Sequence, residues 1–317
     1  MDFLNLLLPI FAIILTGFVV SHFKLLPETV GDILIQFAYN IGLPALLFLV
    51  IAQESLARLF DPGFLLSYGG GTFFFFVLIL VLTKVWRKVS TGDAVILALI
   101  GACANTAFVA LPILKSTFGH KAVLPAAMAC VIMVAMILVG VLLIERTRRG
   151  DDAGEDSIWP HVRHALLNPL VLAVLLGVLY AAVGLPVPVM AAEYLSLLGD
   201  SVTPCALFAV GMSIRLQSLR TGAAAILLLS AVKLIVIPAL VLFLVLLLNL
   251  DPFLSVAAVI CAAVPTAKTI FVLASQYDHK KELAAETVSV GTLASTATLF
   301  VWLIVLAQFY PDTFGAS

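Results

Sequence analysis

The feature that most constrains this chain is its succession of long apolar stretches. A membrane-spanning helix takes about 20 mostly apolar residues. Backbone polar groups in lipid must bond within their own segment, so apolar spans of this length fold as helices. We therefore expect an all-α integral membrane protein with ten transmembrane helices. The ten windows cover about residues 3–22, 30–51, 63–85, 93–115, 122–145, 165–184, 190–213, 222–249, 253–275 and 282–309.

The composition supports a lipid environment. Hydrophobic residues make up 63% of the chain and charged residues 11%, against about 45–50% and about 25% in soluble domains. A net charge of −1 indicates no nucleic-acid partner. All four cysteines lie inside apolar stretches, so we interpret them as small hydrophobic residues rather than disulfides or metal ligands. We expect no metal site and no cofactor.

The basic residues are distributed unevenly between the two sets of loops. Twelve of the 17 Lys and Arg residues fall in loops on one side and three on the other, while Lys233 and Lys268 lie inside predicted helices. Cytoplasmic loops carry the excess of positive charge. We therefore expect a multi-pass protein of the cell (inner) membrane with both termini on the non-cytoplasmic side.

An internal repeat appears when the sequence is shifted by 160 residues. Four matches carry it: Pro9 with Pro169, Gly17 with Gly177, Pro44 with Pro204 and Thr106 with Thr266. Each half has five predicted helices, an odd number, so the halves are inverted relative to each other. Inverted repeats are common in secondary transporters. We predict a first repeat over residues 1–145, a cytoplasmic linker over 146–164 and a second repeat over 165–317.

Two predicted helices combine mid-membrane prolines with polar residues. Asn105 lies about 18 Å into the helix over 93–115, seven residues before Pro112. Pro265 lies at a similar depth in 253–275, beside Thr266 and Thr269. A broken helix in a membrane is tolerated where it is buried in protein or lines a cavity. The N-termini of half-helices attract anions, so the two breaks predict an anion site.

Three charged residues, Lys233, Lys268 and Asp200, lie deep within predicted helices. Charges at mid-depth are costly and usually have a partner or a function, so Lys268 is a candidate to contact an anion, with snorkelling to the interface as the alternative. Lys233 is expected either to pair with Asp200 or to brace backbone carbonyls. Burial would favour the protonated form of Asp200, which suits a coupling proton; a static salt bridge with Lys233 is the competing interpretation.

The sequence resembles the auxin efflux carrier family of transporters over nearly its whole length. The motifs that carry the resemblance are Asn40-x-x-x-Pro44, Asn105-Thr106-x-Phe108-x-x-x-Pro112, Asn168-Pro169, Pro204-x-x-Leu207-Phe208-x-x-Gly211, Lys233-Leu234-x-x-x-Pro238, and Pro265 with Ala274-x-x-Tyr277.

The resemblance implies a fold in which the broken fourth and ninth helices cross and an organic anion binds at the crossing. Asn105, Pro112 and Pro265 would frame the substrate. The first, second, sixth and seventh helices would form a scaffold, often dimeric, and the third to fifth and eighth to tenth a mobile, elevator-like transport unit. The central loop is short, and Ala110 stands where relatives often have Gly. Bacterial-type relatives that move small carboxylates, such as malonate or malate, suit Lys268 better than auxin carriers do.

The expected function is secondary transport of a small organic anion, driven by a proton or ion gradient or by the membrane potential. A sodium symporter of the bile-acid type is an alternative, although the crossing offers no carboxylate. An enzyme would need paired acids or a metal-binding spacing, and a receptor a soluble output domain. The predicted substrate-binding residues are Asn40, Asn105, Thr106, Pro112, Pro265, Thr266, Lys268 and Thr269; the predicted coupling residues are Asp200 and Lys233.

Overall fold

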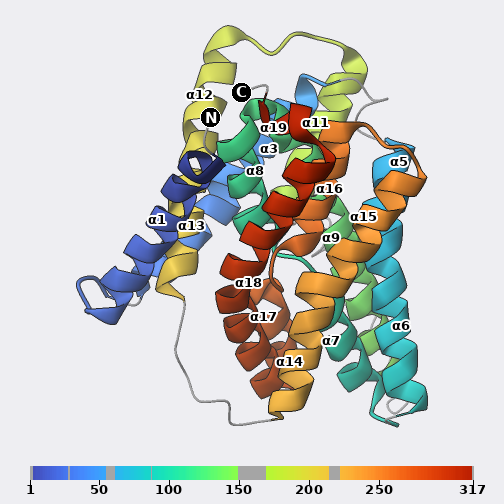
Figure 1. Ribbon diagram of the computed structural model, residues 1–317. Helices are drawn as coiled ribbons and strands as arrows, with labels where there is room; N and C mark the ends of the chain where they lie inside the picture. The colour runs from blue at the N-terminus through green and yellow to red at the C-terminus, as the bar shows by residue number, and fades with distance from the viewer. Residues whose placement is uncertain are drawn as a thin grey trace.

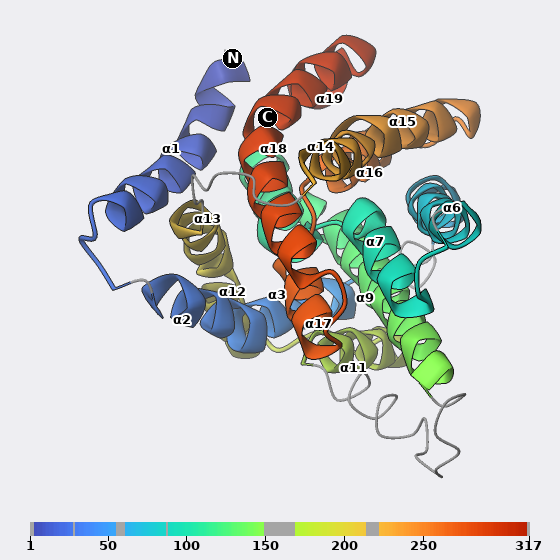
Figure 2. The ribbon, with the colours of Figure 1, turned by 90° about the horizontal axis from the view of Figure 1, so that it is seen from below.

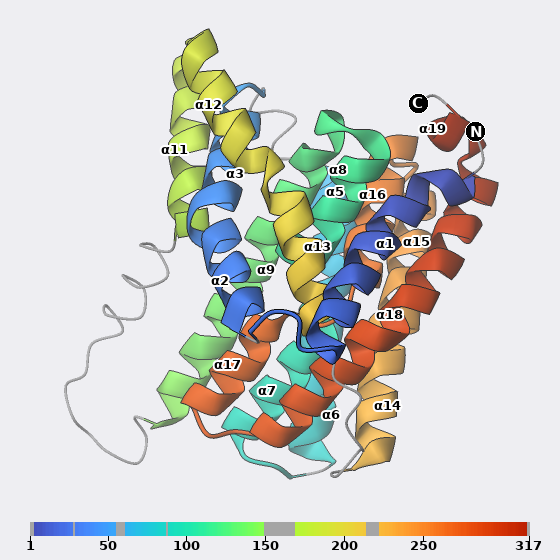
Figure 3. The ribbon, with the colours of Figure 1, turned by 90° about the vertical axis from the view of Figure 1, so that its left-hand side faces the viewer.

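The structure is a bundle of helices with no strand among the residues it describes. It is a computed structural model and describes residues 3–27, 29–54, 61–86, 88–148, 169–213 and 222–315. The chain runs repeatedly along the length of the bundle, and both termini lie at the same end (Figures 1 and 3). The prediction of an all-helical membrane protein is confirmed.

Several rods of the bundle consist of more than one helical segment. The segments of the first half are α1 (Phe3–His22), α2 (Thr29–Phe37), η1 (Ala38–Gly42), α3 (Leu43–Ala52), α5 (Pro62–Phe64), η2 (Leu65–Gly70), α6 (Gly71–Val85), α7 (Thr91–Ala102), η3 (Thr106–Ala110), α8 (Leu111–Phe118), η4 (His120–Ala122) and α9 (Val123–Arg148). The segments of the second half are α11 (Pro169–Val183), α12 (Val189–Asp200), α13 (Val202–Met212), α14 (Ala223–Ala231), η5 (Val232–Val236), α15 (Ile237–Leu247), α16 (Pro252–Ala263), α17 (Lys268–Gln276), α18 (Lys281–Phe309) and α19 (Pro311–Gly315).

Six helical rods in the described part of the chain are long and apolar enough to cross a membrane. They are Thr29–Ala52, Pro62–Val85, His120–Thr147, Val189–Met212, Ala223–Leu247 and Lys281–Phe309, accompanied by shorter apolar helices. Helix α9 extends to Arg148, beyond the predicted boundary at 145. Most of the predicted linker over 146–164 lies outside the described residues.

Proline explains three of the wide helical turns. The π-helical segments η1, η3 and η5 each end two residues before a proline, at Pro44, Pro112 and Pro238. Proline lacks a backbone N–H, and its ring displaces the carbonyl four residues earlier. A local π turn accommodates that carbonyl within a continuous helix. These prolines therefore widen their helices without breaking them.

Small residues let two helix pairs approach closely. A Cβ at Gly17 would collide with the backbone carbonyl of Phe208, and one at Gly211 with that of Ile14, so α1 and α13 touch backbone to backbone. Gly177 on α11 lies similarly against Ile51 on α3. Such contacts are typical of membrane helices, because lipid gives no hydrophobic drive for association and close packing must supply the attraction.

The bundle has an apolar interior and an apolar outer surface. Large side chains on the outside include Phe74, Leu228 and Val301, each more than half exposed. An apolar outer surface of this kind is expected where lipid tails, rather than water, surround the protein. Seen from below, α1, α2, α3, α12 and α13 gather on one side and α6, α14, α15 and α16 on the other (Figure 2).

Candidate functional site

Two interrupted helices meet inside the bundle. Helix α7 ends at Ala102 and helical structure resumes at Thr106; α16 ends at Ala263 and α17 begins at Lys268. The connecting segments pair with each other: Ala104 and Thr266 form an antiparallel bridge, and the N–H of Asn105 donates to the carbonyl of Pro265 over 2.8 Å. Both of these predicted helices are therefore interrupted, as expected.

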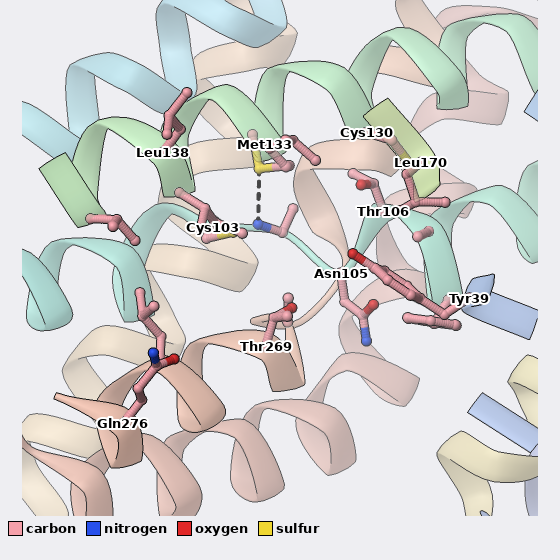
Figure 4. A pocket seen from close by; sticks show the side chains of 18 of the residues that line it. Tyr39, Cys103, Asn105, Thr106, Cys130, Met133, Leu138, Leu170, Thr269 and Gln276 are labelled. Atoms are coloured by element: carbon pink, nitrogen blue, oxygen red, sulfur yellow. Dashed lines mark hydrogen bonds between the residues drawn. The ribbon is translucent and has the colours of Figure 1, made fainter. Parts of the chain in front are cut away.

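The crossing also satisfies polar groups that the breaks leave without helical partners. The Thr266 hydroxyl donates to the Ile100 carbonyl over 2.7 Å, and Thr266 is buried. The N–H of Ala104 points at the Met133 sulfur at 3.2 Å (Figure 4). Unpaired buried backbone groups are costly, so these contacts stabilise a non-helical backbone inside the bundle.

A cavity of about 350 Å³ lies against the crossing. Tyr39, Asn105 and Thr106 stand near one end and Gln276 near the other (Figure 4). The wall formed by α9 is apolar, so polar groups are concentrated on one side. The lining residues are Tyr39, Cys103, Ala104, Asn105, Thr106, Ala107, Phe108, Cys130, Met133, Val134, Ile137, Leu138, Val141, Leu170, Ala267, Thr269, Leu273, Gln276 and Tyr277.

The two helix starts at the crossing differ from three helix starts at the ends of the bundle. Asp61, Ser90 and Asp251 accept hydrogen bonds from backbone N–H groups of α5, α7 and α16, which is ordinary N-capping. The starts of η3 and α17 have no side-chain cap, and residues of both first turns line the cavity. Two positive helix ends thus meet at one cavity.

The structure separates the predicted substrate-binding residues into three groups. Asn105, Thr106 and Thr269 line the cavity. Pro265 and Thr266 form the crossing behind it and are not lining residues.

The remaining predicted substrate-binding residues lie outside the lining. Pro112 is buried as the second residue of α8. Lys268 is the first residue of α17 and is partly buried. The Asn40 side-chain amide donates to the Gln36 carbonyl on its own rod over 2.8 Å.

Some lining residues were not predicted. Tyr39 stacks with Phe108, with ring centroids 6.2 Å apart, and so joins η1 to η3 beside the cavity. The residue predicted in this segment was its neighbour, the polar Asn40. Successive residues of a helix point in different directions, and it is Tyr39 that lines the cavity. Gln276 and Tyr277 close the end of α17; the motif ending in Tyr277 marked this region without assigning it a contact.

Lys233 braces a carbonyl, which was one of its two predicted roles. Its ammonium is fully buried and donates to the Ala262 carbonyl over 2.5 Å. Ala262 belongs to the last turn of α16, where carbonyls lack helical donors and the dipole is negative. Lys233 therefore ties η5 to the end of α16 that leads into the crossing.

The predicted pairing of Asp200 with Lys233 is wrong. Asp200 is exposed at the end of α12, and its carboxylate accepts from the Lys115 ammonium over 2.7 Å. Its burial was inferred from its place between apolar stretches. The structure ends α12 there, however, and α8 supplies a cation from 85 residues away.

A comparison with protein families identifies the chain. The model of the family described as "Membrane transport protein" matches residues 2–303. The chain therefore belongs to this family of membrane transporters, which includes the auxin efflux carriers, and it is not an enzyme.

Similar proteins come from bacteria, archaea and plants. The "Putative malonate transporter" of Rhizobium meliloti is 27% identical over 298 residues, 93% of each chain. An "Uncharacterized transporter" of Methanothermobacter thermautotrophicus is 23% identical over 94% of this chain and 97% of its own. The "Probable auxin efflux carrier component 5b" of Oryza sativa is 32% identical over 47% of this chain and 44% of its own.

Proposed function

We propose that the protein is a secondary transporter that carries a small organic anion through the cavity at the crossing. The observation that carries the proposal is the pair of uncapped helix starts facing one cavity. Each offers backbone N–H groups and a partial positive charge to a carboxylate. The Asn105 amide and the Thr269 hydroxyl add donors, while the apolar side of the cavity suits a carbon skeleton.

The two helix starts support an anion rather than a cation as substrate, because a cation at a helix start opposes the dipole and an anion complements it. Malonate and malate remain the first candidates, because the bacterial relative with 93% coverage is named for malonate. Indole-3-acetate is the comparison substrate, in view of the auxin carrier match.

The proposed mechanism is elevator-type alternating access between two inverted repeats of five helices each. The two interrupted helices support the repeat. The first residues of α7 and α16 are 161 positions apart in the sequence, and so are their last residues, which is close to the offset of 160. The close α1–α13 and α3–α11 contacts support a scaffold of the first (α1), second (α2 and α3), sixth (α11) and seventh (α12 and α13) predicted helices. The remaining helices would move as one unit, with a homodimer formed through the scaffold.

A proton gradient or the membrane potential is the proposed driving force. A sodium symporter remains the alternative. Sodium prefers a cage of oxygen ligands, and the described residues lining the cavity include no carboxylate. The Lys233 amine also occupies the end of α16, where it donates to the Ala262 carbonyl, so we favour transport without sodium. With the basic loops in the cytoplasm, both termini would face outward.

Uptake into proteoliposomes tests the proposal. Labelled malonate, malate and indole-3-acetate would be supplied with a pH gradient, with a potential, and with sodium replaced by choline. We expect saturable uptake of at least one anion that persists in choline. Sodium-dependent uptake would favour the alternative, and no uptake of any anion under any gradient would contradict the proposed substrate class.

A further inference from the structure

An ion pair between Lys115 and Asp200 joins two parts of the bundle that the proposed mechanism requires to move apart. Lys115 lies near the end of α8, and Asp200 is the last residue of α12. The ammonium donates to the carboxylate over 2.7 Å and lies 3.3 Å from the Gly199 carbonyl. Lys115 thus contacts both a carboxylate and the negative end of α12.

Along the chain, Lys115 falls between residues that line two different cavities. The cavity at the crossing begins at Asn105, ten residues before Lys115, or about 15 Å along a helix. A second cavity, of about 440 Å³, begins five residues after Lys115, at His120. Its polar lining residues are Gln53, Glu54, His120, Lys121, Glu193 and Ser196.

Helix α12 shows the same order. Glu193 and Ser196 line the second cavity, and Asp200 follows at the i+7 and i+4 spacing that keeps residues on one helix face. Helices α8 and α13 are in contact, and α8 and α12 lie toward the end of the bundle opposite α17 (Figures 1 and 3). The first cavity extends the other way, toward Gln276 and Tyr277.

The ion pair has no counterpart at the positions that the predicted repeat relates to it. At the offset of 160 residues, Lys115 corresponds to Ser275 and Asp200 to Asn40. Neither counterpart carries a charge, and the Asn40 amide bonds within its own rod. An inverted copy of the contact at the opposite end of the bundle would therefore lack the ion pair.

We propose that Lys115 and Asp200 form a gate that closes the path between the second cavity and the crossing. The inference rests on the proposed function, because it assigns α8 to the moving unit and α12 to the scaffold. The gate stabilises the conformation in which the crossing opens toward α17. Its breakage would increase the fraction of molecules open to the second cavity.

Thiol labelling tests the gate without a known substrate. The parent variant carries Thr203→Cys with all four native cysteines, at 103, 130, 205 and 261, replaced by alanine. The Thr203 hydroxyl is buried, three residues past Asp200. The protein would be held in nanodiscs, so both faces meet a bulky polar maleimide. Exposed ion pairs contribute up to about 1 kcal/mol, which corresponds to a shift of up to about fivefold. We expect Lys115→Ala or Asp200→Asn to accelerate labelling about two- to fivefold.

Two further variants separate the ion pair from general effects. Lys121→Ala removes a charge from the same cavity; Lys121 lies over the Phe253 ring, 5.0 Å from its centroid, and its removal should leave the labelling rate at the parent's value. The double exchange Lys115→Asp with Asp200→Lys should restore slow labelling. Unchanged rates in both single variants, or fast labelling in the double exchange, would overturn the gate. Asp200→Asn carries the test if Lys115→Ala does not fold. A failure of anion uptake would leave these rates unaffected, so the two proposals fail separately.

Discussion

The backbone N–H of Asn105 donates to the carbonyl of Pro265 over 2.8 Å, across 160 residues of sequence. This hydrogen bond and the adjacent Ala104–Thr266 bridge join the two broken helices. The bond places the side chain of Asn105 and the first turn of α17 at the same cavity.

Asn105 is expected to contact the substrate. Hydrogen bonds to a charged group contribute about 1.5–3 kcal/mol, so Asn105→Ala should raise the KM for the transported anion about ten- to hundredfold. Asn105→Asp should abolish uptake, because it puts a negative charge where the anion binds. Initial uptake rates in proteoliposomes measure both. Equal KM values in wild type and Asn105→Ala would remove this contact from the site.

Thr269 tests the second helix start with a matched control. Thr269→Val removes a hydroxyl from the cavity with little change of shape and should reduce transport about tenfold. The Thr292 hydroxyl on α18 donates to the Val288 carbonyl of its own helix, so Thr292→Val should transport normally. If both variants behave alike, the Thr269 hydroxyl has no part in binding.

Thr266 is expected to stabilise the crossing rather than bind substrate. Thr266→Val deletes the buried hydrogen bond to Ile100 and leaves a carbonyl unpaired, which costs about 1–3 kcal/mol. The thermal midpoint in detergent should fall by several degrees, and Thr266→Ser should recover most of the loss. A midpoint for Thr266→Val equal to the wild-type value would show that the bond is dispensable.

Gly211 tests the close contact of α1 with α13. A methyl group there would collide with the Ile14 carbonyl, so Gly211→Ala should destabilise the protein by about 1–3 kcal/mol, the usual cost of overpacking. Gly70 has open space around its Cβ position, and Gly70→Ala is the matched control. Thermal midpoints of the two variants should differ; identical midpoints would contradict the tight α1–α13 packing.

Hydropathy predicted most of the architecture, because lipid imposes helices of a known length. The position of the first break was harder to predict. Pro265 lies in its break, whereas Pro112 lies seven residues past the break that ends at Asn105. A proline at the second position of α8 is accommodated by a π turn, so its place in the sequence does not locate the interruption.

The partners of charged residues were the least predictable part of the site. Lys115 is the last residue of the predicted window 93–115, and its pairing with Asp200 depends on how α8 packs in the bundle, where it contacts α13. Lys233 meets Ala262 through the packing of η5 against α16. Hydropathy and spacing describe single helices and carry no information about which faces meet.

A structure of the protein with a transported anion bound tests the central claim most directly. The account predicts anion density in the cavity at the crossing, within hydrogen-bonding distance of Asn105 and of N–H groups in the first turns of η3 and α17. Density elsewhere, with this cavity empty under saturating anion, would contradict it.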